Sequence, residues 1–147
     1  MRSPSAVRPA AAITVFFATP AIDPAPSIPA PAQTADRRLV AQAQSEDGAI
    51  SLATLVEEGA GRVSLSVSGL EPGPGRAPEL WVVHSDGAPR SLRQIPEGGS
   101  FSRDLTRDER ALFVPGASLA ITYEDGPSIS HEAPSSDILV LGSLSEI

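Results

Sequence analysis

Apolar and polar side chains alternate with a period of two through residues 37–147, which is the pattern of β-strands that bury one face. The clearest case is residues 63–68, where three aliphatic side chains alternate with three serines. Residues 80–83 are apolar at every position, which predicts a central strand buried on both faces. The pattern predicts about eight strands, at residues 38–44, 50–56, 63–68, 80–83, 91–95, 100–105, 119–123 and 138–144.

Turn residues separate these runs. The gaps at residues 45–48 and 59–61 contain glycine and have the length of hairpin turns. Residues 71–76 hold two prolines, so we expect this segment to stay out of any strand ladder. Thr106 and Glu109 have the spacing of a helix-capping box, which predicts one short helical turn over residues 106–112. Together these features predict an all-β fold, an antiparallel β-sandwich.

The first 36 residues differ in composition from the rest. Residues 1–22 begin with two arginines and continue into an apolar stretch that is shorter than the ~20 residues needed to span a bilayer. They fit a signal-like segment, the outer end of a membrane helix, or an apolar tail, and the first two readings place the rest of the chain outside the cytoplasm. Residues 23–36 are rich in proline and alanine and favour an extended linker of roughly 40 Å. Residues 37–147 then form the folded domain.

Charge and composition exclude some partners. The formal net charge is −7, and all of this excess falls on residues 37–147. An acidic surface repels nucleic acid, so we expect no nucleic-acid partner. The chain has no cysteine, which excludes disulfides and thiolate metal sites. All eleven basic residues are arginine, a bias typical of a GC-rich bacterial genome.

Residues that carry chemistry are few. His84 and His131 are the only histidines, and each lies near an acid in the sequence. Two imidazoles without cysteine do not supply the three or four ligands of a metal site, so we expect two loop histidines, no metal and no cofactor. Residues 116–120 stop one glycine short of a Gly-x-Ser-x-Gly nucleophile elbow. The sequence therefore predicts no catalytic residue and no enzyme.

Two further side chains stand out. We expect Trp81, the only tryptophan, to lie in the core with Phe101, Phe113 and Tyr123, and a ligand-cradling role is the alternative. Arg90 either pairs with Glu79 or Asp86 across a hairpin or faces a partner. The sequence leaves both readings of Arg90 open, and it assigns no binding residues.

Four motifs, in order and at similar spacing, resemble the C-terminal domain of the anti-sigma-K factor (RskA-type) family. Residues 79–81, 88–92 and 119–122 resemble the family's Glu-Leu-Trp, Ala-Pro-Arg-Ser-Leu and Leu-Ala-Val-Ser elements, and residues 138–142 resemble its closing apolar strand. The resemblance spans about residues 39–144. The sequence departs from the family at Arg93, where a glycine is usual, and in the shortened loop at residues 124–128.

The resemblance implies a sensory or regulatory domain outside the cytoplasm, anchored through the N-terminal segment, that controls an extracytoplasmic-function sigma factor and so represses transcription. The implied partner is a protein of the cell envelope, either a membrane anti-sigma component or a protease. Full-length members hold the sigma factor with a cytoplasmic helical domain. No such domain stands in this sequence, so we do not expect this chain to sequester a sigma factor by itself. The alternative is an exported β-sandwich that binds protein or glycan without any link to transcription.

Overall fold

The computed structural model describes residues 36–126 and 131–147. The predicted segment 1–22 lies outside the described residues, and so does the linker 23–36 except for its last residue. No helix in the described part of the chain is long and apolar enough to cross a membrane.

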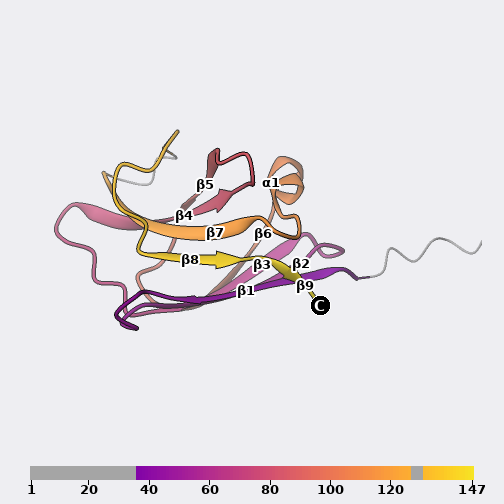
Figure 1. Cartoon of the computed structure of the whole chain (residues 1–147), viewed down its shortest axis with the longest axis horizontal. Helices are drawn as coiled ribbons and strands as arrows, with labels where there is room; N and C mark the ends of the chain where they lie inside the picture. Colours follow the sequence, from indigo (N-terminus) through magenta and orange to yellow (C-terminus); the bar gives the residue numbers. More distant parts are fainter. Residues whose placement is uncertain (1–35, 127–130) are drawn as a thin grey trace, which may run out of the picture. The chain divides into compact units, whose positions relative to one another are not determined.

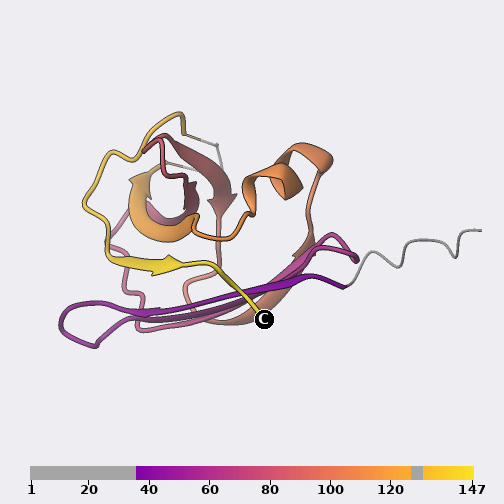
Figure 2. The same cartoon turned by 45° about the vertical axis from the view of Figure 1, so that its right-hand side comes forward.

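Two antiparallel sheets make up the domain, which confirms the predicted all-β sandwich (Figures 1 and 2). In the five-stranded sheet the order is β6 (Gly99–Asp104), β3 (Arg62–Ser68), β2 (Ser51–Glu57), β1 (Arg38–Gln44) and β9 (Ser145–Glu146). In the four-stranded sheet the order is β5 (Pro89–Gln94), β4 (Arg76–Val83), β7 (Ser118–Asp125) and β8 (Val140–Ser143). Seven of the eight expected strands agree with the structure to within two residues at each end.

The hydrophobic core lies between the sheets and follows from the period-two alternation. Each inward-facing aliphatic side chain leaves water on folding, which stabilises the fold by about 1.5–3 kcal/mol per fully buried residue. The inward positions of β1, β2 and β3 meet those of β4 and β7 across the layer, and Phe113 and Leu144 belong to the same core. The core includes Leu39, Leu52, Val56, Val63, Leu65, Leu80, Val82, Leu119 and Ile121.

The short helix α1 (Arg107–Leu112) connects β6 of one sheet with β7 of the other. The predicted capping box is confirmed: the Glu109 amide donates to Thr106 Oγ1 at 3.2 Å, and the Thr106 amide donates to Glu109 Oε2 at 2.9 Å. Arg103 donates two further hydrogen bonds to the same carboxylate, at 2.9 and 3.0 Å. These Arg103 bonds are the main reason that the pKa of Glu109 lies below its usual value, and they outweigh the opposing effect of burial.

One expected boundary was wrong. β4 begins at Arg76 rather than at residue 80, because Arg76 and Pro78 already pair with β7. The expected strand 138–144 corresponds to β8, which pairs with β7; beyond it the chain passes through Leu144 into β9, which pairs with β1 in the other sheet. Gly142 allows β8 to lie close to β1, since a Cβ at this position would lie 2.9 Å from Ala43 Cβ. Period two marks strands but does not say which sheet a strand joins.

Candidate functional site

Two glutamates are fully buried on the side of the four-stranded sheet that faces away from the core. Glu79 in β4 and Glu124 in β7 both have 0% of their surface exposed. Alternation along β4 places Glu79 on this outward side of the sheet, because its neighbour Leu80 and Val82 point into the core. A buried carboxylate is costly unless it is paired or hydrogen-bonded, so the cover over this face must supply partners. Residues 131–139, which we call the strap, supply many of them.

Glu79 receives hydrogen bonds from β5 and from the strap. The Ser91 hydroxyl donates to Oε1, and the His131 amide donates to the same oxygen at 3.2 Å. The His131 ring contacts the other oxygen, with 2.5 Å between Nδ1 and Oε2. This hydrogen bond is the main cause that raises the pKa of His131, burial opposes it, and the charges of Glu79 and Glu124 add to the increase. The imidazole and the buried carboxylate thus form a pair at the start of the strap, an ion pair whenever His131 is protonated.

Glu124 is held in the same manner by Ser135, which lies four residues after His131 in the strap. The Ser135 amide donates to both carboxylate oxygens, at 3.0 and 3.1 Å, and the Ser135 hydroxyl also donates to Oε2. Thr122 Oγ1 donates to Oε1 at 2.5 Å and accepts from Trp81 Nε1 at 2.9 Å. Burial by itself raises the pKa of Glu124, but the hydrogen bonds from Ser135 and Thr122 outweigh it and the pKa lies below the usual value.

The order of groups around Glu79 suits binding of the strap rather than catalysis. A serine nucleophile is activated when a histidine stands between the hydroxyl and the carboxylate. Here the carboxylate of Glu79 stands between Ser91 and His131 and accepts from both. Within residues 36–126 and 131–147, no three histidine or acidic side chains form a group that could hold a metal ion.

The model of the family "Anti-sigma-K factor rskA, C-terminal" matches residues 6–138. The chain belongs to this family. No curated protein and no solved structure matches it. The family is regulatory and not catalytic, so membership gives the chain an anti-sigma-factor-like regulatory role with a protein partner. The match begins and ends earlier in the chain than the expected span of residues 39–144, and it stops before β8.

Three of the four motifs that carry the resemblance to the anti-sigma-K family meet in this buried cluster. Glu79 and Trp81 come from the first motif, Ser91 from the second and Thr122 from the third. Thr122 stands where the family element has serine, and both residue types offer the hydroxyl that joins Trp81 to Glu124. The motif residues therefore serve to bury two carboxylates and to bind the strap.

Position 93, where the family usually has glycine and this chain has arginine, also has a structural explanation. Arg93 has φ of 74°, the only positive value among the described non-glycine residues. The residue lies in a β-bulge, because Trp81 pairs with Ser91 while Glu79 pairs with Gln94. The Arg93 amide donates to Ser91 Oγ at 3.0 Å. The same Ser91 hydroxyl donates to Glu79, so Ser91 bonds both to the bulge and to the buried carboxylate. A left-handed conformation favours glycine, which this chain has replaced with arginine.

The structure corrects two expectations for single residues. Trp81 is fully buried, as expected, but it lies on the outward side of its sheet within the polar cluster and not in the core between the sheets. Arg90 does not pair with Glu79, whose carboxylate is occupied by Ser91 and His131, and Asp86 accepts instead from the Ala88 amide at 3.0 Å. The pair of Glu79 with His131 was not predicted, because 52 positions separate the two residues.

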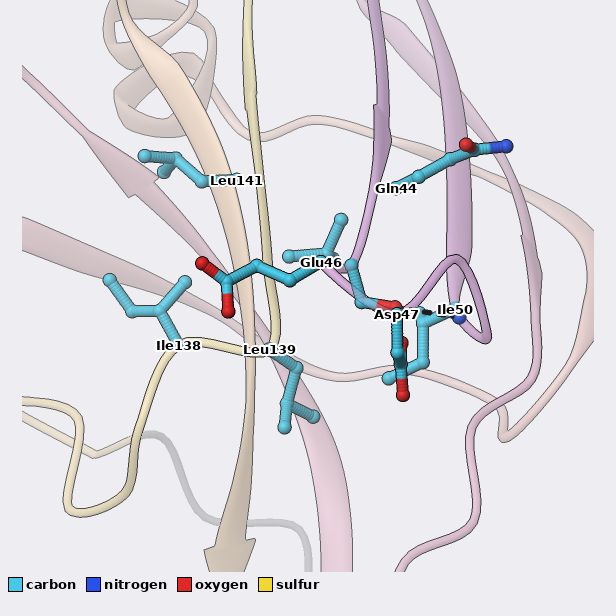
Figure 3. Close-up of a pocket in the computed structure, with 9 residues that line it drawn as sticks. Gln44, Glu46, Asp47, Ile50, Ile138, Leu139 and Leu141 are labelled. Carbon is cyan, nitrogen blue, oxygen red and sulfur yellow. Dashed lines mark hydrogen bonds between the residues drawn. The ribbon is translucent and has the colours of Figure 1, made fainter.

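A second feature of this anti-sigma-K domain is a hollow of about 570 Å³ beside β8 (Figure 3). Residues 138–141 line it from one side, and the turn between β1 and β2, which includes Glu46 and Asp47, lines it from the other. Ile138 and Leu141 are 50% and 53% exposed. The hollow thus joins an apolar strand edge to two acidic side chains.

Proposed function

We propose that this chain presents an anti-sigma-K-type regulatory domain outside the cytoplasm, and that the folded domain restrains the release of an extracytoplasmic-function sigma factor. The observation that carries the proposal is the family match over residues 6–138, which includes the N-terminal segment as well as most of the folded domain. The acidic charge of residues 37–147 agrees with a protein partner rather than nucleic acid.

The buried cluster suggests how folding connects to regulation. The motif residues are used to bind the strap, so the domain acts through its folded state and its surface. In the proposed mechanism, the stable domain limits access of an envelope protease or a membrane anti-sigma component to the linker at residues 23–36. A signal that loosens the domain would then permit cleavage and free the sigma factor.

The test has two arms in the bacterium that encodes the chain. In the first, protease is added to spheroplasts, and we expect residues 37–147 to be degraded while a cytoplasmic marker survives. In the second, these residues are deleted from the gene, and we expect transcripts of the sigma-dependent promoter to rise several-fold. Glu132→Gln, a change at an exposed position, is the matched control and should leave transcription unchanged. Protection from protease would overturn the location, and unchanged transcription on deletion would leave an exported binding module as the better account.

A further inference from the structure

The outer face of the five-stranded sheet is organised in rows that run across four strands. The strand register places Arg38 opposite Glu57, Glu57 opposite Arg62, and Arg62 opposite Asp104, so the first row alternates in charge. Alternation along each strand puts the next outward residues in three further rows. These are Val40, Leu55, Ser64 and Ser102, then Gln42, Ala53, Ser66 and Ser100, then Gln44, Ser51 and Ser68.

The three rows beyond the first carry no charged side chain, although 20% of the chain's residues are charged. Their serines bond to one another across the strands, with Oγ–Oγ distances of 2.7 Å for Ser51 and Ser68 and 2.9 Å for Ser64 and Ser102. In each pair one hydroxyl donates and the other accepts, so covering the pair leaves fewer unmet hydrogen bonds than covering two separate hydroxyls. The face is therefore suited to contact with another surface.

The charged row, in which Arg62 already pairs with Asp104 at 3.2 Å within one chain, has a symmetry that suits a second copy as the partner. Read from β1 to β6 the row is Arg, Glu, Arg, Asp, and read backwards it has the opposite charge at every position. A two-fold axis that runs along the strands between β2 and β3 places a second copy on this face with its strand order reversed. Arg38 of one copy then faces Asp104 of the other, and Glu57 faces Arg62. We propose that this face is the interface of a symmetric dimer of the chain.

Side-chain sizes are also complementary when the strand order of the second copy is reversed. In the dimer Leu55 of one copy faces Ser64 of the other, Val40 faces Ser102, and Gln42 faces Ser100. A hollow of about 400 Å³ on this face is lined by residues of all four strands, from Val40 in β1 to Ser102 in β6. The larger side chains of β1 and β2 thus meet the small side chains of β3 and β6 of the partner, as a close-packed interface requires.

The area of this sheet face sets the expected strength of the dimer. Two sheets pack face to face with their strands within about 30° of one another, which a two-fold axis along the strands permits. Four strands spaced by about 4.8 Å, three of seven residues and one of six, cover roughly 20 by 23 Å. This is the small end of the range for specific interfaces, so we expect a weak dimer that dissociates on dilution. The proposal concerns only the sheet surface and does not depend on the role in transcription.

A charge exchange tests the proposal. In Arg38→Glu the new carboxylate faces Asp104 at both ends of the interface, and in Asp104→Arg two guanidinium groups face one another. We expect sedimentation equilibrium of the full chain to show dimerisation weakened at least tenfold in each variant alone. Mixing the two variants restores opposite charges at both ends, so a heterodimer should form about as well as the wild-type dimer.

The matched control is Arg90→Glu, an equal charge reversal on the exposed surface of β5 in the other sheet, which should leave dimerisation unchanged. Recovery in the mixture also shows that both variants are folded. A monomeric wild-type chain, single variants that dimerise like the wild type, or a mixture that does not recover would each overturn the proposal. A dimer formed through another segment of the chain would give the second of these results.

Discussion

The imidazole of His131 lies 2.5 Å from the carboxylate of Glu79, a side chain with no exposed surface in a strand 52 positions earlier in the sequence. The contact fixes the first described residue of the strap to β4. With the bonds from Ser135 to Glu124, it attaches the strap at two points to neighbouring strands. The stability of the domain should therefore depend on the protonation of both sites.

The His131 site predicts a loss of stability at alkaline pH. The folded-state pKa of His131 is raised from 6.5, so its contribution is complete below about pH 6.5 and is lost as the pH rises through the raised value. We expect the free energy of unfolding, measured in urea from pH 6 to pH 9, to fall more steeply in the wild type than in His131→Gln. Ser145→Ala, which changes no titratable group at an exposed position in β9, is the control and should keep the wild-type slope. Equal slopes in the wild type and His131→Gln would contradict the assignment.

The Glu124 site predicts a loss of stability in acid. Its folded-state pKa is lowered from 4.5, so its contribution is present above about pH 4.5 and is lost as the pH falls through the lowered value. Ser135→Ala removes the hydroxyl donor but keeps the amide, and at neutral pH we expect it to cost about 1–3 kcal/mol, as for a hydrogen bond to a charged group. Ser145→Ala, at an exposed position in β9, should change stability by less than about 0.5 kcal/mol. A similar cost for both changes would show that Glu124 does not hold the strap.

Arg93 offers a stabilising substitution. Since its φ of 74° is strained for a residue with a Cβ, Arg93→Gly should raise the free energy of unfolding by about 0.5–1 kcal/mol. Thermal unfolding followed by circular dichroism would measure the change. The same substitution at Arg90, in the regular part of β5, should instead destabilise the domain by about 0.5–1 kcal/mol. A loss of stability in Arg93→Gly would mean that contacts of the arginine side chain outweigh the backbone strain.

The capping box of α1 is open to a matched pair of changes. Thr106→Ala removes the acceptor for the Glu109 amide and should cost about 1 kcal/mol, whereas Thr106→Ser keeps the hydroxyl and should cost little. Urea unfolding of the two variants at pH 7 would separate them. Equal stability of the alanine and serine variants would indicate that the bond from Arg103 to Glu109 alone holds the helix start.

Features that depend on neighbouring residues could be predicted from the sequence. Alternation in residues 63–68 defined β3 and its buried face, and the spacing of Thr106 and Glu109 defined the start of α1. Both depend on contacts within a few positions, where residue type and period determine the conformation.

Features that depend on the tertiary fold could not be predicted in this way. The apolar run 80–83 indicates burial on both faces but does not reveal that the outward side holds Trp81 in a polar cluster. No local pattern pairs Glu79 with His131, and none shows that the chain changes sheets between β8 and β9. The family's usual glycine at position 93 was the one available signal of the β-bulge, since glycine often marks a positive φ.

In the proposed function, the folded domain, bound together through its buried carboxylates, restrains sigma-factor release. The most direct measurement is the level of sigma-dependent transcripts in cells that carry Glu124→Ala, which removes the acceptor of the strap, beside cells that carry the control Ser145→Ala. We predict a several-fold rise with Glu124→Ala and no change with Ser145→Ala. Unchanged transcription in the Glu124→Ala cells, with the purified variant shown to be destabilised, would mean that the folded state of the domain does not restrain sigma-factor release.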